Sequence, residues 1–365
     1  MELVRFTNSG TEANMMAVAT AIAWTNRKKI LVFDKGYHGA TLSFRAVPAG
    51  HAMKTVNLPH EWVVGTYNDI AATEKALSDL PDDSLAAIIV EPMLGSGGAI
   101  PGSLPFLRFL RSYASSHGSL LIFDEVMTSR LSYRGLGHKL GIQPDLMTLG
   151  KWVGGGMSFG AFGGRRDIMG MFDPRSGSLA HAGTFNNNVL SMAAGCAGCE
   201  LLDMDATNRL NTLGERMKAS VQDAIDSHLD LQMTHMNGVP NSVPNGVPKA
   251  SSTADANGAL AKSGDSTGHL NGKQNRVEPQ PRVSGSTMWI TGIGSILVVH
   301  FAPSVIESTL QSLYYHHMLS ENIYLAERGF IALSIELRNE HIEAFVAATR
   351  RFVEKYEHLL LGAWQ

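Results

Sequence analysis

The chain has 365 residues, a length that suits two or three domains, and its formal net charge of −3 gives no bulk positive field to hold a nucleic acid or an anionic membrane. Two cysteines are too few for a disulfide scaffold or a four-thiolate zinc site, and no apolar run reaches the 18 residues of a membrane span. The first residues, Met1 to Thr11, lack the basic and apolar regions of a signal peptide. We therefore expect a soluble, cytoplasmic enzyme and predict no metal site.

Short apolar runs alternate with amphipathic stretches through the first two hundred residues. The runs predicted as strands are Val4–Thr7, Ile30–Phe33, Leu85–Val90, Leu120–Phe123, Leu146–Leu149 and Phe159–Gly163. Helical patterns lie between them, as at Glu12–Trp24 and Leu104–Ser115. Several strands are apolar on both faces, which is typical of strands that helices cover on each side. The alternation predicts an α/β fold with a mostly parallel, helix-covered sheet.

The pattern changes at about residue 205. A long helix over Asn208–His228, a strand over Ile296–Phe301 and a closing helix over Glu340–Leu361 predict a small α+β domain at residues 205–365, after a large domain at 1–204. We predict that an insertion at 233–287 interrupts the small domain. This segment contains no Phe, Trp or Tyr, and it reads NGVP-NSVP-NGVP at 237–248. Such a composition cannot bury enough apolar surface to offset its ordering entropy, so it predicts disorder, with a partner-binding linker as the alternative.

The first candidate site feature is a turn after the first strand. Active sites in open α/β sheets lie at the carboxyl ends of the strands, and Asn8 to Glu12 (NSGTE) follows the strand at 4–7. A small turn with a glycine at a helix N-terminus presents free N–H groups and a positive dipole end to a phosphate. Ser9 followed by Glu12 equally predicts a helix cap, so this feature alone leaves both interpretations open.

Two further strand ends carry charged residues. Asp124 follows the strand at 120–123 and could bind a metal, act as a base or pair with a cationic ring nitrogen. Lys151 follows the strand at 146–149 and precedes the glycines at 154–156, where the backbone is expected to approach another segment closely. Desolvation there favours the uncharged, nucleophilic amine, whereas the alternative is a surface lysine beside a flexible loop. A phosphate turn, an aspartate and a lysine are together the parts of a pyridoxal phosphate site.

Six stretches resemble the class III (subgroup II) aminotransferases in order and spacing. They are NSGTEA (8–13), YHG (37–39), IIVEP (88–92), LLIFDEVMT (120–128), PDLMTLGKWVGGGMSFGAFGGR (144–165) and HAGTFNNN (181–188). The chain is most similar to the branch of glutamate-1-semialdehyde aminomutase and the β-amino acid aminotransferases. The resemblance covers residues 3–203 closely and 289–361 more loosely. It implies fold type I, pyridoxal 5'-phosphate as cofactor, and a homodimer.

The resemblance also implies roles for single residues. Lys151 would form the Schiff base with the cofactor and then move the substrate proton, and Asp124 would keep the pyridine nitrogen protonated. Thr184 would reach the cofactor phosphate of the neighbouring subunit. The other implied cofactor contacts are Ser9, Gly10 and Thr11 at the phosphate, Tyr37 on one ring face with His38 beside it, Glu91 near the hydroxyl edge and Val126 on the opposite face. Tyr37 and Val126 are alternatively ordinary core residues, and His38 alternatively satisfies a local hydrogen bond.

The implied reaction is a ping-pong transfer of an amino group from an amino acid or amine to a keto acid. HAGTFNNN looks most like the β-amino acid branch, which favours a β-amino acid or an aryl-amine donor. Arg328, which follows a strand-like run at Asn322–Leu325, would hold a substrate carboxylate unless it pairs with Glu327 or Glu336. Ser96 stands where ω-amino acid aminotransferases have a glutamate and the aminomutase an asparagine, so neither specificity is supported. The alternatives are an aminomutase and a truncated, non-catalytic relative, because only seven residues precede NSGTEA.

One remaining motif is Cys196–Cys199, a CxxC within the apolar helical run at Val189–Leu202. No histidine or second cysteine pair accompanies it. The pattern therefore favours buried packing cysteines over a redox pair.

Overall fold

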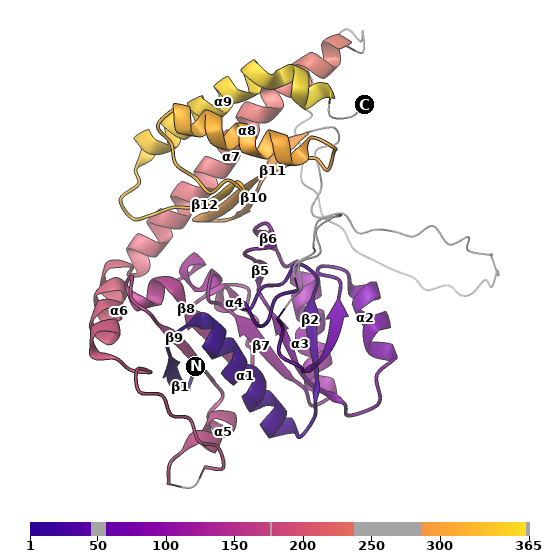
Figure 1. The fold of residues 1–365 in the computed structure, drawn as a ribbon, viewed down its shortest axis with the longest axis vertical. Coiled ribbons are helices and arrows are strands. Elements are labelled where there is room, and N and C mark those ends of the chain that lie inside the picture. The colour runs from indigo at the N-terminus through magenta and orange to yellow at the C-terminus, as the bar shows by residue number, and fades with distance from the viewer. Residues whose placement is uncertain (45–55, 176, 237–286, 363–365) are drawn as a thin grey trace, which may run out of the picture.

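The computed structural model describes residues 1–44, 56–175, 177–236 and 287–362. A larger body around a wide sheet lies below a smaller body in Figure 1, and one long helix, α7 (Met204–Met236), runs from the first into the second. Within the described residues no helix is both long and apolar enough to cross a membrane.

The sheet of the larger body contains seven described strands in the order β1-β9-β8-β7-β4-β2-β3. Their bounds are β1 Leu3–Thr7, β2 Lys29–Phe33, β3 Glu61–Gly65, β4 Leu85–Val90, β7 Leu120–Asp124, β8 Leu146–Gly150 and β9 Gly160–Gly164. Strands β8, β7, β4, β2 and β3 are parallel, while β9 runs antiparallel to both β8 and β1. The mostly parallel sheet confirms the predicted fold class.

Helices cover both faces of this sheet. Along β2, Ile30 and Val32 pack in one apolar cluster with α1 (Gly10–Thr25) and α5 (Arg166–Met169). Leu31 and Phe33 pack in another with α2 (Ile70–Ser78) and α3 (Leu104–Ser116). Side chains alternate between the faces of a strand, so a strand buried on both sides must be apolar throughout. Strand β4 is an example, because all six of its residues are buried.

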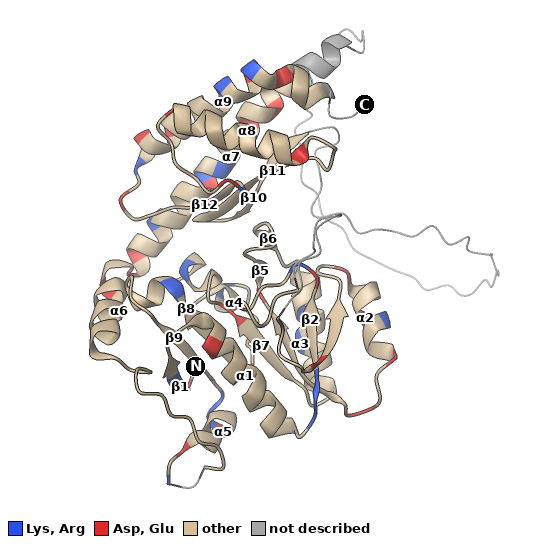
Figure 2. Ribbon diagram, viewed as in Figure 1, with Lys and Arg blue, Asp and Glu red and all other residues tan. Residues whose placement is uncertain are grey.

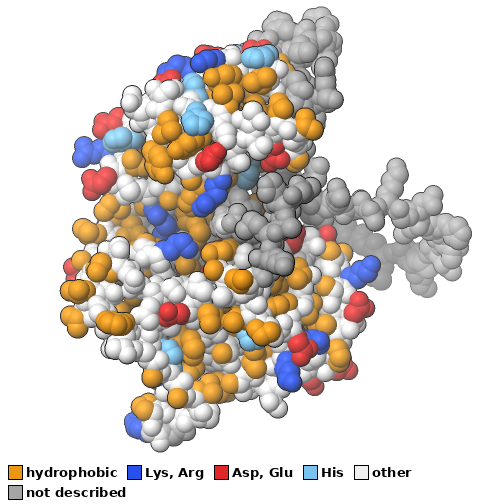
Figure 3. All heavy atoms as spheres, viewed as in Figure 1, with side chains coloured by type: hydrophobic (Ala, Val, Ile, Leu, Met, Phe, Trp, Pro, Cys, Tyr) orange, Lys and Arg blue, Asp and Glu red, His pale blue; other side chains and the backbone are white. Residues whose placement is uncertain are grey.

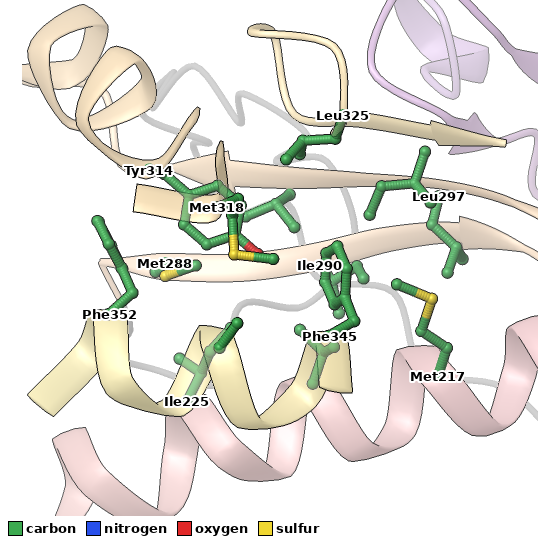
Figure 4. Close-up of a cluster of buried hydrophobic side chains, with 14 of the residues drawn as sticks. Met217, Ile225, Met288, Ile290, Leu297, Tyr314, Met318, Leu325, Phe345 and Phe352 are labelled. Carbon is green, nitrogen blue, oxygen red and sulfur yellow. The ribbon is translucent and has the colours of Figure 1, made fainter. Parts of the chain in front are cut away.

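The smaller body packs three helices on an antiparallel sheet. The sheet has the order β10-β11-β12, with bounds Met288–Ile293, Ile296–Phe301 and Phe330–Ala332. Helices α7, α8 (Glu307–Ser320) and α9 (Asn339–Gly362) surround a core that Figure 4 shows, with Ile225, Tyr314 and Phe352 among its buried side chains. This is the small α+β unit that the sequence predicts.

Polar and apolar contacts fix the two bodies to each other. The hairpin β5–β6 (Met93–Leu94 and Ile100–Pro101) contributes Met93 to a buried cluster that also contains Ile296 and Val298 of β11. Arg130 donates from Nε to Ser295 Oγ (3.1 Å). The loop between β5 and β6 is therefore held between the bodies.

The other described elements of the larger body are short, apart from one helix. They are 3-10 turns at Thr128–Leu131, Lys151–Gly154 and Gly170–Phe172, with helices α4 (Leu136–Lys139) and α6 (Val189–Leu201).

Three expectations need correction. The segment Asn322–Leu325, which looks strand-like in the sequence, forms no strand and leads into a turn at Glu327–Arg328. Helix α7 continues to Met236, past the predicted start of the insertion at 233. Thr287, the last residue of the predicted insertion, is buried. The rest of the insertion, residues 237–286, lies outside the described residues. Cys196 and Cys199 are exposed on α6 and are therefore not buried packing residues. The domain boundary at 204/205 stays a prediction.

Candidate active site

The carboxyl ends of four neighbouring parallel strands form one wall of a cavity of about 300 Å³. Strand β7 ends at Asp124, β8 ends directly before Lys151, and β4 ends directly before Glu91. The pair Tyr37–His38 follows the end of β2 after a short turn. The adjacency in the sheet brings together side chains that are far apart in the sequence. The cavity is lined by Gly10, Thr11, Asn14, Tyr37, His38, Gly39, Glu91, Ser96, Asp124, Val126, Met127 and Lys151.

Asp124 is the most firmly positioned of these groups. Asp124 is only 4% exposed. Its Oδ2 accepts a hydrogen bond from Asn14 Nδ2 (2.8 Å) and lies 2.8 Å from His38 Nδ1. Its Oδ1 accepts from the backbone N–H of Val126 (3.0 Å). Asn14 is in turn held by Thr148, whose Oγ1 donates to Asn14 Oδ1 (2.7 Å). A buried carboxylate with this many donors is fixed in its orientation.

Two buried groups beside Asp124, the side chains of His38 and Glu91, have shifted pKa values. Burial by itself lowers the pKa of His38, but the hydrogen bond and negative charge of Asp124 and the charge of Glu91 outweigh it, so this pKa is raised. Burial raises the pKa of Glu91 to about 7, with the charge of His38 opposing and that of Asp124 adding to the rise. Glu91 accepts from the backbone N–H groups of Tyr37 (3.0 Å) and Gly95 (2.8 Å). Its carboxyl therefore joins two loops of the cavity.

The turn before α1 combines the two functions that the sequence left open. Ser9 is the helix cap, because its Oγ accepts from Glu12 N (3.1 Å), and it does not line the cavity. Gly10 and Thr11, the first residues of the helix, do line it. The first N–H groups of a helix have no partner inside the helix and are free to bind an anion.

Gly10 is also required by packing. A Cβ atom at this position would lie 2.8 and 2.9 Å from the two methyl carbons of Val126, which is buried. Val126 thereby closes the cavity against the start of α1.

Lys151 reaches the cavity from a strained turn. It has a φ of +50° and begins the 3-10 turn after β8. The expectation of a desolvated lysine is wrong for this structure, since Lys151 is exposed; the following glycines supply no side chains to cover it. The close backbone approach predicted at these glycines is present, because a Cβ at Gly155 would lie 1.9 Å from Ala194 O of α6.

Two predicted residues lie outside this cavity. Thr184 is exposed on the segment before α6. Arg328 is exposed and lies over the ring of Phe330, with its guanidinium carbon 5.2 Å from the ring centroid. It forms no ion pair with a described residue, and Glu327 instead accepts from Ser312 Oγ (2.6 Å). Arg328 lines a second cavity, which shares Ser96 with the first.

Sequence reasoning missed several positioning residues. Asn14 and Thr148 orient Asp124, and Glu125 accepts from Leu136 N (2.7 Å), Gly137 N (2.8 Å) and Thr128 Oγ1 (3.0 Å). An asparagine one turn into the alanine-rich helix α1 is the signal that could have pointed to Asn14, because buried polar side chains need partners. Glu125 is fully buried and anchors the chain that follows β7.

The chain is similar to proteins of known family and structure. The family model described as aminotransferase class-III matches residues 1–239. A β-phenylalanine transaminase of Variovorax paradoxus is 41% identical in an alignment 369 residues long, which covers 99% of this chain and 71% of that protein. The solved structure of a β-phenylalanine aminotransferase from the same organism has a TM-score of 0.78 at 39% identity, covering 99% of this chain and 72% of that one. A solved transaminase with pyridoxal phosphate bound has a TM-score of 0.72 at 27% identity, covering 99% and 74%.

Proposed function

The chain belongs to the class-III aminotransferases, whose cofactor is pyridoxal 5'-phosphate, and from this premise we propose that it transfers the amino group of a β-amino acid to a 2-oxo acid in two half-reactions. The observation that carries the donor class is the 41% identity with a β-phenylalanine transaminase over nearly the whole chain.

The residues around the first cavity fit the cofactor. A buried, multiply hydrogen-bonded carboxylate at Asp124 suits a cationic pyridine nitrogen, and the aromatic and apolar side chains of Tyr37 and Val126 suit the faces of a flat ring. The free N–H groups at Gly10 and Thr11 suit a phosphate. A primary amine, Lys151, lines the same cavity. We propose that these residues hold the cofactor.

When bound, the cofactor supplies an aldehyde that condenses with amines and a cationic ring that takes up electrons from the substrate carbon. Lys151 would hold it through Nζ and move the proton that leaves the amino-bearing carbon of the substrate. Asp124 would keep the ring nitrogen protonated, with Asn14 and His38 fixing its Oδ2. Glu91 would orient the loop of Tyr37 through the backbone N–H that it binds.

We further propose a homodimer in which Thr184 reaches the neighbouring subunit's phosphate site. Large apolar side chains are exposed on and around α6, namely Phe185, Val189, Leu190, Leu201 and Met204, with Val189 as much as 79% exposed. Figure 3 shows hydrophobic side chains gathered over this part of the larger body. Such a patch is typical of a protein–protein interface. Two free cysteines agree with a reducing, cytoplasmic location.

Arg328 is the proposed partner of the donor carboxylate. Its planar guanidinium offers two parallel donors to a carboxylate, it has no competing described carboxylate, and the cavity that it lines adjoins the cofactor cavity at Ser96. Gly329 next to it has a φ of +76°, and a Cβ there would lie 2.2 Å from Val299 O, so the turn that presents Arg328 packs tightly on β11.

The test is a half-reaction followed by absorbance. We expect β-phenylalanine to convert the cofactor to its amine form, and added pyruvate to restore the aldehyde form and appear as alanine. Arg328→Lys should raise KM for β-phenylalanine about tenfold or more while sparing 1-phenylethylamine, which has no carboxylate. Return of the amino group to a neighbouring carbon of the same molecule, with none on pyruvate, would indicate an aminomutase; no change of the cofactor with any donor would indicate a non-catalytic relative.

A further inference from the structure

Lys151 lies on a turn that its own backbone does not favour. Its φ of +50° is in the left-handed region, where residues other than glycine are uncommon. Such a conformation persists only where the surrounding structure holds it in place. Because Lys151 itself is exposed, we looked for the contacts that hold the turn among its neighbours.

Trp152, the next residue of the turn, is anchored on two sides. Its indole Nε1 donates to Ser129 Oγ (2.9 Å), and its side chain packs against the apolar core of the smaller body. Ser129 is buried and Trp152 is partly buried. An indole N–H that is removed from water needs an acceptor, so this hydrogen bond fixes the orientation of the ring. Trp152 thus connects the turn of Lys151 to other parts of the molecule.

Ser129 belongs to the 3-10 turn Thr128–Leu131, which we call the connecting turn. Three consecutive residues of this turn hold three different parts of the protein. Thr128 Oγ1 donates to the buried Glu125 of the larger body (3.0 Å). Ser129 accepts from Trp152, and Arg130 binds the smaller body. The connecting turn therefore joins both bodies to the turn of Lys151.

Arg130 attaches the connecting turn to the smaller body through neutral partners. Its Nε donates to Ser295 Oγ (3.1 Å), and its Nη2 donates to the carbonyl oxygen of Leu333. Its own carbonyl oxygen accepts from Asn211 Nδ2 of α7 (3.0 Å), and Asn211 Oδ1 accepts from Ser295 N (2.9 Å). In Figure 2 the basic residues on the turns between α6 and α4 lie directly below the smaller body. A displacement of the smaller body would therefore move the connecting turn with it.

We propose that Trp152 is a positioning residue for Lys151, and that its hydrogen bond with Ser129 makes the direction of the lysine amine depend on where the smaller body lies. The inference rests on the proposed function for the role of Lys151, whereas the contacts of Trp152 and Ser129 stand on the structure alone. A shift of the smaller body then changes the distance between the amine and the substrate carbon, on which the rate of proton transfer depends.

The kinetic experiment removes the hydrogen bond from either end in the holoenzyme. We expect Ser129→Ala and Trp152→Phe each to lower kcat with β-phenylalanine and pyruvate about tenfold and to change KM less than about twofold, because proton transfer is affected and substrate binding is not. The double variant should be no slower than the slower single variant, since both changes remove the same bond. Ser129→Thr, which keeps the hydroxyl, should retain most of the rate.

The matched control is Trp62→Phe. It removes an equivalent hydrogen bond, from Trp62 Nε1 to Leu58 O (2.9 Å), on the edge strand β3, and should leave kcat unchanged. An equal fall of kcat in this control, or multiplicative effects of Ser129→Ala and Trp152→Phe in the double variant, would overturn the inference. If Trp152→Phe does not fold, Ser129→Ala, which removes one oxygen atom, decides the test against the same control.

The spectroscopic experiment needs no turnover. The visible absorbance of the cofactor-loaded protein depends on whether the nitrogen that joins Lys151 to the cofactor carries a proton, and this depends on its distance from charges such as that of Asp124. The pH at which the absorbance changes by half should therefore move by about 0.5 or more in Ser129→Ala and Trp152→Phe, and should not move in Trp62→Phe.

An unmoved absorbance midpoint in both variants, with only a loss of resistance to urea, would mean that Trp152 merely stabilises the fold, and the inference would be wrong. If the loaded protein transfers no amino group at all, the proposed function fails instead, and the absorbance midpoint still decides whether Trp152 positions the amine.

Discussion

The contact between Gly10 and Val126 gives a prediction whose size follows from the coordinates. In Gly10→Ala the new methyl would lie 2.8 and 2.9 Å from the Val126 methyl carbons, whereas carbon atoms prefer separations of about 3.5–4.0 Å. Val126 is buried, and its branched side chain has little rotational freedom. Overpacking of this kind costs about 1–3 kcal/mol, and the helix preference of alanine over glycine returns up to about 1 kcal/mol. We expect a net loss of about 1–2 kcal/mol.

The measurement is urea unfolding of the cofactor-free chain, followed by circular dichroism. Val126→Ala alone removes two buried carbon groups and should cost about 1–2 kcal/mol. The double variant removes the overlap, so it should be more stable than the sum of the single effects by at least about 1 kcal/mol. Gly170→Ala is the matched control, because nothing lies within 4 Å of a Cβ there and its φ is −61°; it should be neutral or slightly stabilising.

Strict additivity of the two single changes would refute the reasoning, because it would mean that Val126 moves aside at no cost. A loss of stability in Gly170→Ala equal to that in Gly10→Ala would refute it as well, since the effect would then come from replacing a glycine and not from the overlap.

The remaining predictions concern the ionisable groups of the site. Borohydride should fix the cofactor to Lys151, as peptide mass spectrometry would detect, and Lys151→Ala should lose both the label and turnover; a label on Lys139 instead would contradict the assignment. Asp124→Asn should retain cofactor absorbance but lose activity by about 100-fold or more, whereas near-normal turnover would show that its charge is dispensable. The pKa of Glu91, raised to about 7, means that the folded chain binds the extra proton, so stability should fall as pH rises from about 4.5 to about 7. Urea unfolding of Glu91→Gln should lack this part of the pH dependence, and parallel profiles for the two proteins would argue against the shift.

The periodicity of the sequence was sufficient for the central parallel strands of the larger body, β2, β4, β7 and β8, because buried parallel strands leave a distinct pattern. Strand β4 matches its predicted bounds, Leu85–Val90, since every residue in it is apolar and buried. The hydrophobic pattern did not predict the secondary structure correctly where tertiary contacts determine it. Strand β3 at the sheet edge carries an exposed Val64 and was not predicted. The segment at 322–325 looks extended in the sequence but pairs with no described strand.

In the candidate site, too, some residues could be predicted from the sequence and others could not. Asp124 and Lys151 were predictable because each charged residue follows a buried strand, and the order of strands then brings them to one cavity. The side chains that bind Asp124 were not predictable, because Asn14 lies on helix α1 and His38 follows strand β2. Only the tertiary fold brings each of them within 2.8 Å of Asp124 Oδ2. The exposure of Lys151 was also beyond a local pattern, because it depends on which segments cover the cavity mouth.

The close packing of α6 on the turn after Lys151 has a mechanical consequence. A Cβ at Gly195 would lie 2.7 Å from Val153 O, and one at Gly198 would lie 3.1 Å from Gly155 Cα, so helix and turn touch backbone to backbone. With no side chains between them to absorb a displacement, a force on the outer side of α6 is transmitted to the turn. Helix α6 also carries the exposed apolar residues Val189 and Leu201. Whatever docks on that side therefore presses on the backbone that aims the lysine amine.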